Sequence, residues 1–393
     1  MTTLVQDKVA TADARTTAAD VPQPAPLVNV TRGGITESRH RGHVCAVDGD
    51  GSVVAFLGSP ETVSYLRSSS KPHQAIPLVA SGAADRFNFT PQEIAIACGS
   101  HSGEPVHTET VAGMLRKIGL DESALKCGAH EPYSKETARA LGERGEEPTA
   151  LHNNCSGKHA GMLALALQLG ARVEAYDEPS SPVQLAISRI IEQFSSIPLE
   201  DVAVGTDGCG VPTFGVTVRA MALMAVRLVA PLAEWNTAVR AAARRIVAAM
   251  TSHPLMIEGT NEMDTELITL TKGRLVSKVG AEGVYTAAVL PCAEYPRGLG
   301  VAIKLEDGDR KERARPVAVV ETLRQLGLLR AAELDALSRF AGDTLTNHRG
   351  DRVGEVCAAF ELRDDYPPRA ETPARSNGSN RGSASRPTTQ TRG

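Results

Sequence analysis

The sequence contains no long hydrophobic run and no block of basic residues. A membrane-spanning helix needs roughly 18 consecutive apolar residues, and the most apolar stretch, residues 216–235, is interrupted by Arg219 and Arg227. The net charge of −4 and the lack of clustered Lys and Arg argue against a nucleic-acid-binding protein. The polar N-terminus has no apolar signal core, and this predicts a cytoplasmic protein that does not contact membranes.

Several short signatures of metal, redox and nucleotide chemistry are also missing. None of the seven cysteines forms a CxxC pair, which argues against a zinc ribbon, a thioredoxin-type site and a zinc deaminase. No GxGxxG follows a predicted strand, and the segment CSGKH lacks the upstream glycine and the following Ser or Thr of a P-loop. In a cytoplasmic protein the cysteines are expected to be thiols or ligands. They are Cys45, Cys98, Cys127, Cys155, Cys209, Cys292 and Cys357.

The compositions of the two ends of the chain predict disorder. Residues 1–26 lack aromatic side chains and end in VPQPAP, and residues 367–393 consist largely of Ser, Gly, Pro and Arg. Neither segment has enough apolar side chains to form a core. We therefore expect the ordered part, residues 27–366, to be a single catalytic unit.

Strand-like segments lie at both ends of this unit, and helical patterns lie between them. Two β-rich segments flank GDG, which predicts a hairpin, and TPQEIAIAC begins with a capping box formed by Thr90 and Glu93. The sheet region is predicted at residues 27–66 and 270–362, and the helical region at residues 67–269. The predicted fold class is α/β (α+β), an antiparallel sheet from both termini backed by helices, with an inserted helical region.

The segment RSSSKPHQ places three serines beside a lysine. Ser68 and Lys71 are three positions apart, so they share one face of a helix. A serine beside a lysine that can lose its proton is a nucleophile beside its base. The motif S-x-x-K is weak by itself, because Ser123 and Lys126 form a second match that resembles an ordinary helix start. The alternative for the first match is a helix cap and a solvated lysine.

Two later segments add polar groups in a meaningful order. ACGSHSGE is a Gly-broken loop between predicted helices and carries Ser100 and His101, while Lys278 ends a predicted strand before a Gly-rich turn. The chain order is serine, lysine, a second serine and then a lysine on a late strand. The same order is found in penicillin-recognising serine enzymes, but their S-D-N and K-T-G motifs are absent at the second and third elements here. The alternatives are a helix–helix turn and a solvated lysine.

Cysteines in two polar, Gly-rich loops form a second candidate site. LHNNCSGKHAGML contains Asn154, Cys155 and Lys158, and VAVGTDGCGVPTFG contains Asp207 and Cys209. Two thiolates from separate loops suit one shared zinc ion, and Asp207 is either a ligand or a group that orients one. The alternative is that both cysteines are small buried residues.

Seven segments together resemble one protein family. In chain order they are RSSSKPHQ, ACGSHSGE, HNNCSGKHAGML, GTDGCGVPTF, GTNEMDTEL, SKVGAEGVY and GVAIKLEDGD. From Leu27 to Leu362 the chain is similar to the class 3, rhizobial-type L-asparaginases, the asparaginase II family. The resemblance implies a fold similar to serine β-lactamases and glutaminases, a homodimer, and hydrolysis of L-asparagine to L-aspartate and ammonia.

The resemblance also implies roles for individual residues. Ser68 with Lys71 resembles the family's first Ser–Lys pair, Ser100 its second serine, and Lys278 the lysine partner of that serine. The residues that resemble the family's zinc ligands are Cys155, Lys158 and Cys209. The predicted substrate-binding residues are Arg67, His101, Asn154 and Asp207.

The predicted reaction is acyl transfer through a covalent intermediate. One serine, deprotonated by its lysine, attacks the side-chain amide carbon; ammonia leaves and water releases aspartate. Lysine can serve as the base only if burial or a neighbouring cation destabilises its ammonium. The sequence leaves open which serine attacks and whether asparagine or glutamine is preferred. Two other functions remain open: a zinc-dependent amidohydrolase acting on L-glutamine or a related amide, and a non-catalytic, metal-bound amino-acid sensor.

Overall fold

The computed structural model describes residues 23–366 of the chain. The predicted tails, residues 1–26 and 367–393, therefore lie outside the described residues except for residues 23–26. Strand β1 (Ala25–Arg32) begins two residues before the predicted start of the catalytic unit, because Ala25 pairs with Gly42 of the neighbouring strand. Within the described range, no helix combines the length and the apolar character that crossing a membrane requires.

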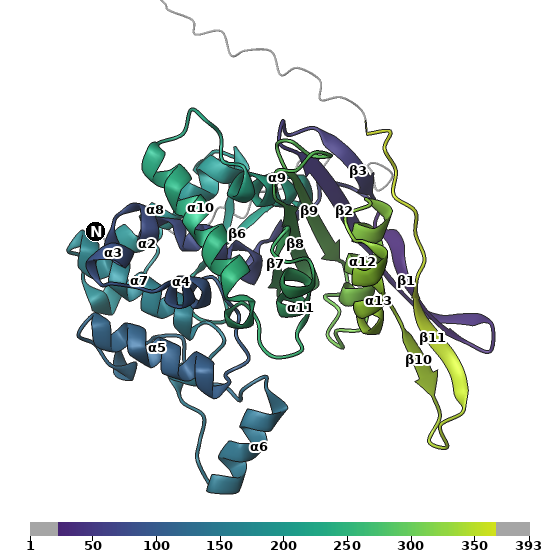
Figure 1. Cartoon of the computed structure of the whole chain (residues 1–393), viewed down its shortest axis with the longest axis horizontal. Coiled ribbons are helices and arrows are strands. Elements are labelled where there is room, and N and C mark those ends of the chain that lie inside the picture. The colour runs from purple at the N-terminus through teal and green to yellow at the C-terminus, as the bar shows by residue number, and fades with distance from the viewer. Residues whose placement is uncertain (1–22, 367–393) are drawn as a thin grey trace, which may run out of the picture.

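A large antiparallel sheet forms the centre of the molecule (Figure 1). Seven of its eight strands follow the order β10-β11-β1-β2-β9-β8-β7, and the eighth, β3, pairs with β2. Strands from the two ends of the chain meet in it, because β1 pairs with β11 and β2 pairs with β9. This arrangement confirms the predicted sheet built from both termini. Its other strands are β2 (Ile35–Asp48), β3 (Val53–Leu57), β7 (Leu275–Gly280), β8 (Val284–Val289), β9 (Leu299–Leu305), β10 (Asp343–Thr346) and β11 (Arg352–Ala358).

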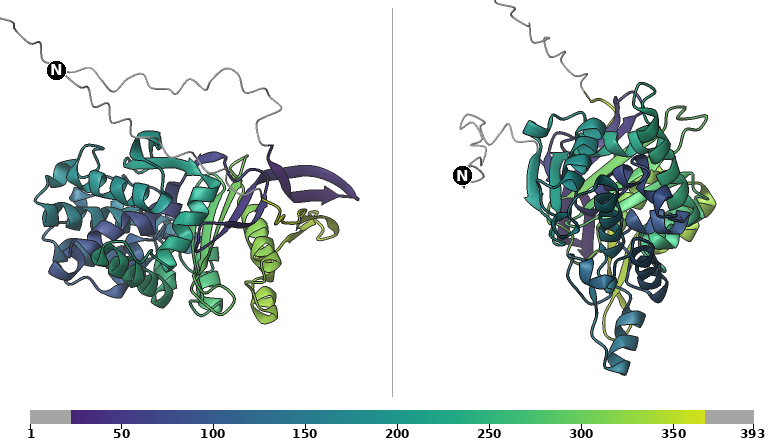
Figure 2. Two further views of the ribbon diagram at one scale, coloured as in Figure 1. Left: turned by 90° about the horizontal axis from the view of Figure 1, so that it is seen from above. Right: turned by 90° about the vertical axis from the view of Figure 1, so that its left-hand side faces the viewer.

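Helices cover both faces of this sheet, so its central strands contribute apolar side chains to two hydrophobic cores. Neighbouring side chains of a strand point to opposite faces. Val47 of β2 joins the core shared with the helical region, and Ala46 joins the core under helix α12 (Arg315–Gln325). Helix α9 (Val218–Val229) packs on the first face. Figure 2 shows the sheet between the helical region on one side and α12 and α13 (Ala331–Ala336) on the other.

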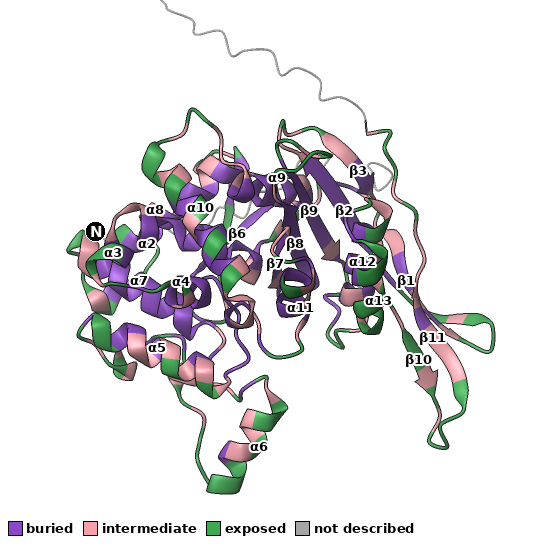
Figure 3. Cartoon of the chain, in the orientation of Figure 1, coloured by how far each residue is buried: buried purple, intermediate pink, exposed green. Residues whose placement is uncertain are grey.

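The helical region surrounds one internal helix. Every residue of α7 (Ser156–Leu169) from Ser156 to Ala166 is buried (Figure 3). Polar side chains in this part of α7, among them Lys158, must therefore find their partners inside the protein. The other elements between β4 and β7 are η1 (Arg67–Ser70), α1 (Lys71–Gln74), α2 (Ile76–Ala80), α3 (Ala83–Arg86), α4 (Pro91–Ala97), α5 (Pro105–Lys117), η2 (Glu122–Ala124), α6 (Lys135–Arg144), η3 (Ala150–His152), η4 (Val173–Ala175), α8 (Pro182–Ser195), η5 (Leu199–Asp201), α10 (Thr237–Ser252), η6 (Pro254–Met256) and α11 (Met263–Leu270).

A small three-stranded sheet brings distant segments of the chain together. Its order is β4-β6-β5, with β4 at Val63–Tyr65, β5 at Ala203–Thr206 and β6 at Pro212–Thr217. β5 and β6 lie within the segment predicted to be helical. The N–H of Leu66, just before η1, donates to the Phe214 carbonyl of β6 at 2.9 Å. The small sheet therefore places the β5–β6 turn beside the start of η1.

Candidate active site

Lys71 lies at the centre of the candidate site. The 3-10 helix η1 continues directly into α1, and this turn directs the Lys71 side chain into the protein, where it is fully buried. Its Nζ donates hydrogen bonds to Ser100 Oγ at 2.9 Å and to the carbonyl oxygens of Gly99 at 2.7 Å and Asn154 at 3.1 Å. Burial lowers the pKa of Lys71 to about 8.

Charged neighbours also act on the Lys71 ammonium. The Cys155 and Cys209 thiolates would raise its pKa, whereas Lys158 and Lys278 lower it through charge repulsion. Burial is the largest of these effects on the Lys71 pKa, and together they leave Lys71 able to lose a proton near neutral pH. A lysine in this state can serve as a general base.

Ser100 is held by the loop that follows α4. The capping box predicted for Thr90 and Glu93 is present at the start of this helix. A Cβ at Gly99 would lie 2.1 Å from the Met256 carbonyl oxygen, so only glycine permits this close approach. The Ser100 N–H donates to the Ile257 carbonyl at 2.8 Å. Packing of these two loops thus sets the position of the Ser100 hydroxyl.

Lys71 hydrogen-bonds to Ser100 and not to Ser68, which differs from the pairing that the sequence predicts. Among the interactions of residues 23–366, none involves the Ser68 hydroxyl. Ser68 is half-buried and follows Arg67, whose φ of +49° lies in the left-handed region that non-glycine residues rarely adopt. The three acceptors of Lys71 come from loops distant in sequence, and this long-range packing decides its partner.

Lys278 is likewise paired differently from the prediction. It lies buried on β7, and its Nζ contacts Asp264 Oδ2 at 3.5 Å and the Val279 carbonyl at 3.1 Å. In the described part of the chain no hydrogen bond joins Lys278 to Ser100. A buried carboxylate attracts the ammonium more strongly than a neutral hydroxyl does, which explains the difference.

The two cysteines predicted as zinc ligands lie together. Lys158 Nζ donates to Cys209 Sγ at 2.9 Å, and Cys209 Sγ lies 3.9 Å from Asp207 Oδ2. A hydrogen bond with Cys209 lowers the pKa of the Cys155 thiol well below its usual range, and the same bond raises the pKa of Cys209. Burial opposes the charge of Lys158, but the interactions with Cys155, Cys209 and Asp207 raise its pKa above its ordinary value.

These donors fit a zinc ion only if Lys158 takes part. Within residues 23–366, no three His, Cys, Asp or Glu side chains are grouped so that they could hold a metal ion. Two thiols and one amine are nevertheless brought together, and zinc accepts sulfur and nitrogen donors. Lys158 would have to lose its proton to bind a metal.

The four predicted substrate-binding residues have different surroundings. Arg67 Nε donates to Asp207 Oδ1 at 2.7 Å, so this pair links η1 to the β5–β6 turn. Asn154 offers its backbone carbonyl to Lys71, and its side chain is half-buried. His101 is fully buried, with Nδ1 accepting from Gly103 N and Nε2 bonded to Ser156 Oγ at 2.9 Å. Both ring nitrogens of His101 therefore have hydrogen-bond partners within the protein.

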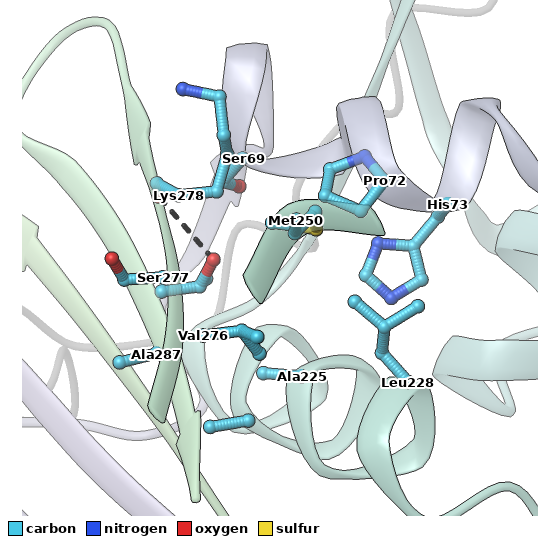
Figure 4. Close-up of a pocket in the computed structure, with 12 residues that line it drawn as sticks. Ser69, Pro72, His73, Ala225, Leu228, Met250, Val276, Ser277, Lys278 and Ala287 are labelled. Atoms are coloured by element: carbon cyan, nitrogen blue, oxygen red, sulfur yellow. Dashed lines mark hydrogen bonds between the residues drawn. The ribbon is translucent and has the colours of Figure 1, made fainter. Parts of the chain in front are cut away.

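A small cavity lies beside this site (Figure 4). It measures about 20 Å³, which is room for about one water molecule. Its walls include Ser69, His73 and the carbon chain of Lys278, whose nitrogen points away from the cavity. The Lys278 ammonium therefore lies outside the cavity, next to the Asp264 carboxylate.

Comparison with known sequences identifies the family. The sequence model of one protein family, described as L-asparaginase II, matches residues 28–358. The chain belongs to the asparaginase II family. It is therefore an amidohydrolase, as the resemblance implied. No curated protein matches the chain.

Solved structures with some likeness to this asparaginase II family chain include glutaminases and a β-lactamase. A probable glutaminase from Bacillus subtilis, complexed with 6-diazo-5-oxo-L-norleucine, is 13% identical over 73% of this chain and 84% of its own, with a TM-score of 0.37. A β-lactamase from Burkholderia ambifaria is 14% identical over 74% of this chain and 94% of its own, with a TM-score of 0.36. Both TM-scores lie below 0.5, so the fold of this chain is described from its own strands and helices and not from these structures.

Two acidic residues of the asparaginase II site were missed from the sequence. Asp264 is fully buried against Lys278, and Glu258 Oε2 accepts from the Asp264 N–H at 2.7 Å. Burial and the Asp264 carboxylate raise the pKa of Glu258 to about 8. Asp and Glu side chains are mostly exposed, so the only available signals were the place of Asp264 in the segment GTNEMDTEL and that of Glu258 directly before it.

Proposed function

We propose that this amidohydrolase converts L-asparagine to L-aspartate and ammonia by serine–lysine catalysis. The observation that carries the proposal is the 2.9 Å contact between Lys71 Nζ and Ser100 Oγ. A buried amine with a pKa of about 8 has roughly a tenth of its population neutral at pH 7. Asparagine is preferred over glutamine in this proposal because the matching family is described as L-asparaginase II.

Ser100 is the proposed nucleophile, since it is the serine that contacts Lys71. Neutral Lys71 takes the proton from Ser100 Oγ, and this oxygen forms a bond to the side-chain amide carbon of the substrate. Lys71 then gives that proton to the amide nitrogen, the carbon–nitrogen bond breaks, and ammonia leaves. An ester between Ser100 and the aspartyl group remains.

Hydrolysis of this ester restores the enzyme. A water molecule gives a proton to Lys71, and its oxygen bonds to the ester carbon. The bond to Ser100 Oγ breaks, and Lys71 returns the proton to that oxygen. L-aspartate is released, with Ser100 protonated and Lys71 neutral again.

The negative oxygen formed during attack needs hydrogen-bond donors. The Ser100 N–H is already used by the Ile257 carbonyl. The N–H of Ser68 stands at the start of η1, where the first amides of a helix have no partner within the helix. We therefore propose the Ser68 N–H as a donor to this oxygen. The Ser68 hydroxyl remains available to bind the substrate.

The proposed zinc site would lie next to this machinery. Cys155, Lys158 and Cys209 would hold the ion, with Asp207 beside it. Bound zinc would supply a Lewis-acidic centre that attracts polar groups of the substrate. Arg67 and Asp207 join the two parts of the site, and we propose that they help to position the amino acid.

Ammonia release from L-asparagine and L-glutamine tests this function. We expect kcat/KM for L-asparagine to be at least about tenfold higher. Acid quenching during turnover, followed by mass spectrometry of peptides, should place the aspartyl adduct on the peptide that carries Ser100. An adduct on the Ser68 peptide would overturn the choice of nucleophile, and a wild-type protein that releases no ammonia would overturn the function.

The two alternatives give different results in the same assays. In a zinc-dependent hydrolase, removal of the metal by a chelator abolishes kcat, because the metal activates water. In our proposal the metal-free protein keeps its kcat and loses affinity. An amino-acid sensor would bind asparagine and release no ammonia from it.

We also propose the homodimer and the cytoplasmic location that the sequence predicts. Light scattering on the purified protein measures the mass of the assembly. A mass equal to that of one chain would overturn the homodimer. Fractionation of cells that produce the protein tests its location.

A further inference from the structure

The segment that joins η2 to α6 connects two loops of the candidate site. Its end is bonded to the loop after α4, because the Ser134 N–H donates to the Ser102 carbonyl at 2.9 Å. Its middle is bonded to the loop before α7, because His130 Nε2 contacts the Asn154 N–H at 3.0 Å. Both loops supply hydrogen-bond partners to Lys71. The segment therefore lies where it can set the position of these partners.

The hydrogen bonds of His130 determine which of its ring nitrogens carries the proton. The ring is half-buried and stacks on Tyr133, with 5.1 Å between the ring centroids. Nε2 faces the Asn154 N–H, which can only donate, so Nε2 is the acceptor. Nδ1 lies 2.7 Å from the Glu131 carbonyl oxygen, which can only accept, so Nδ1 is the donor. His130 is therefore neutral, with its proton on Nδ1.

The Asn154 carbonyl helps to orient the amine of Lys71. A neutral amine has two N–H groups and one lone pair. The carbonyl oxygens of Gly99 and Asn154, at 2.7 and 3.1 Å from Nζ, can only accept hydrogen bonds, so they take the two N–H groups. The lone pair is then left for the hydroxyl of Ser100, at 2.9 Å. A shift of either carbonyl would turn the lone pair away from the proton that it has to accept.

The backbone of Asn154 is held on both sides of its Cα atom. On one side, the Asn154 N–H is held by His130. On the other side, the peptide group that contains the Asn154 carbonyl also contains the Cys155 N–H, which donates to Asn153 Oδ1 at 2.8 Å. Asn153 is buried, and its Nδ2 donates to the Cys127 carbonyl at 2.9 Å. Because peptide groups are planar, holding both of them fixes the direction of the Asn154 carbonyl.

We propose that His130 is a positioning residue for amide hydrolysis, which holds the Asn154 backbone so that its carbonyl directs the lone pair of Lys71 toward the attacking hydroxyl. The inference rests on the function proposed above. Within residues 23–366, no hydrogen bond joins His130 to Lys71 or to Ser100. His130 therefore acts through the backbone that it holds, and what it contributes is the acceptor on Nε2.

Two substitutions of opposite character test this role. His130→Phe keeps a ring that can stack on Tyr133 but has no acceptor, whereas His130→Gln loses the ring and can place an amide oxygen near the position of Nε2. Ammonia release from L-asparagine measures kcat. We expect His130→Phe to lose at least about tenfold in kcat and His130→Gln to remain within about threefold of wild type. A smaller loss in His130→Phe, or a larger one in His130→Gln, would overturn the proposal.

Hydrogen exchange measures the same contact without catalysis. The Asn154 N–H should exchange slowly in the wild type because it donates to His130. Mass spectrometry of the peptide that contains Asn154 should show faster exchange in His130→Phe and wild-type exchange in His130→Gln. Equal protection in all three proteins would overturn the proposal. Even if His130→Phe does not fold, His130→Gln still has to keep both kcat and this protection.

His152→Phe is the matched control. His152 is half-buried and also accepts a backbone N–H, that of Thr149 at 3.1 Å, but no hydrogen bond in the described part of the chain joins its side chain to Lys71. We expect kcat within about threefold of wild type. A loss as large as in His130→Phe would overturn the proposal, because any disturbance of this region would then lower kcat.

Two further measurements separate the possible failures. Zinc content should be the same in wild type and in the His130 variants, and a lower zinc content in His130→Phe alone would assign its loss of kcat to the metal site and overturn the proposal. If the wild type releases no ammonia, the proposed function fails. The exchange experiment then still shows whether His130 holds the Asn154 backbone.

Discussion

Lys71 Nζ lies 2.9 Å from Ser100 Oγ, although the two residues are 29 positions apart in the chain. The contact joins the start of α1 to the loop after α4, and both groups are buried. In a water-poor site a hydrogen bond is stronger than at the surface, and an ammonium is less stable. The same buried surroundings therefore hold the Ser100 hydroxyl in place and lower the pKa of the lysine that serves as its base.

Lys71→Met and Ser100→Ala should each lower kcat by at least about a thousandfold, equivalent to roughly 4 kcal/mol of barrier. The first change removes the base and the second removes the attacking oxygen. Ammonia release measures kcat, and circular dichroism checks folding. Ser123→Ala is the control, because its hydroxyl is exposed and bonded to Asp121. A folded Lys71→Met enzyme within tenfold of wild type would exclude Lys71 as the base.

The kcat/KM for asparagine should rise with pH and level off above about 8. Lys71 must be neutral to accept a proton, and its pKa is lowered to about 8. Lys278→Met removes a cation that lowers this pKa, so the acidic limb should move to higher pH. A pH profile between 5 and 10 measures both effects. A limb that stays in place in Lys278→Met would show that the two lysines are not electrostatically coupled.

Cys155→Ser and Cys209→Ser should lower zinc content and affinity for asparagine together. Each change replaces a thiolate by a hydroxyl, a weaker zinc ligand. Metal analysis after purification without chelators measures the first effect, and KM the second. Cys292→Ser, at an exposed cysteine, is the control. Wild-type protein with less than about a tenth of an equivalent of zinc would rule out the site.

Gly99→Ala should lower kcat at least about tenfold and also destabilise the fold. The new Cβ would lie 2.1 Å from the Met256 carbonyl oxygen, so the loop that carries Ser100 must shift. Thermal unfolding and ammonia release measure the two effects. Gly142→Ala is the matched control, because a Cβ added to this helical glycine in α6 would meet no atom within 4 Å. Alanine there should be neutral or stabilise the fold by up to about 1 kcal/mol. Equal behaviour of the two variants would contradict the packing argument.

Local patterns predicted much of the architecture. The capping box of Thr90 and Glu93 is formed as expected, and the hairpin signal GDG lies between the paired strands β2 and β3. Both features depend on residues close together in the chain. The order of seven short segments also led to the asparaginase II family, which the match over residues 28–358 confirms.

The partners of the two lysines could not be predicted in this way. The S-x-x-K spacing placed Ser68 near Lys71, but the acceptor that Lys71 reaches is Ser100. Lys278 was assigned to Ser100, and the structure gives it Asp264. A sequence determines periodicity, caps and turns because these are local. Which buried amine contacts which oxygen depends on how loops distant in sequence pack against each other. A buried charge needs a polar partner, and it can only pair with a group that this packing places close to it.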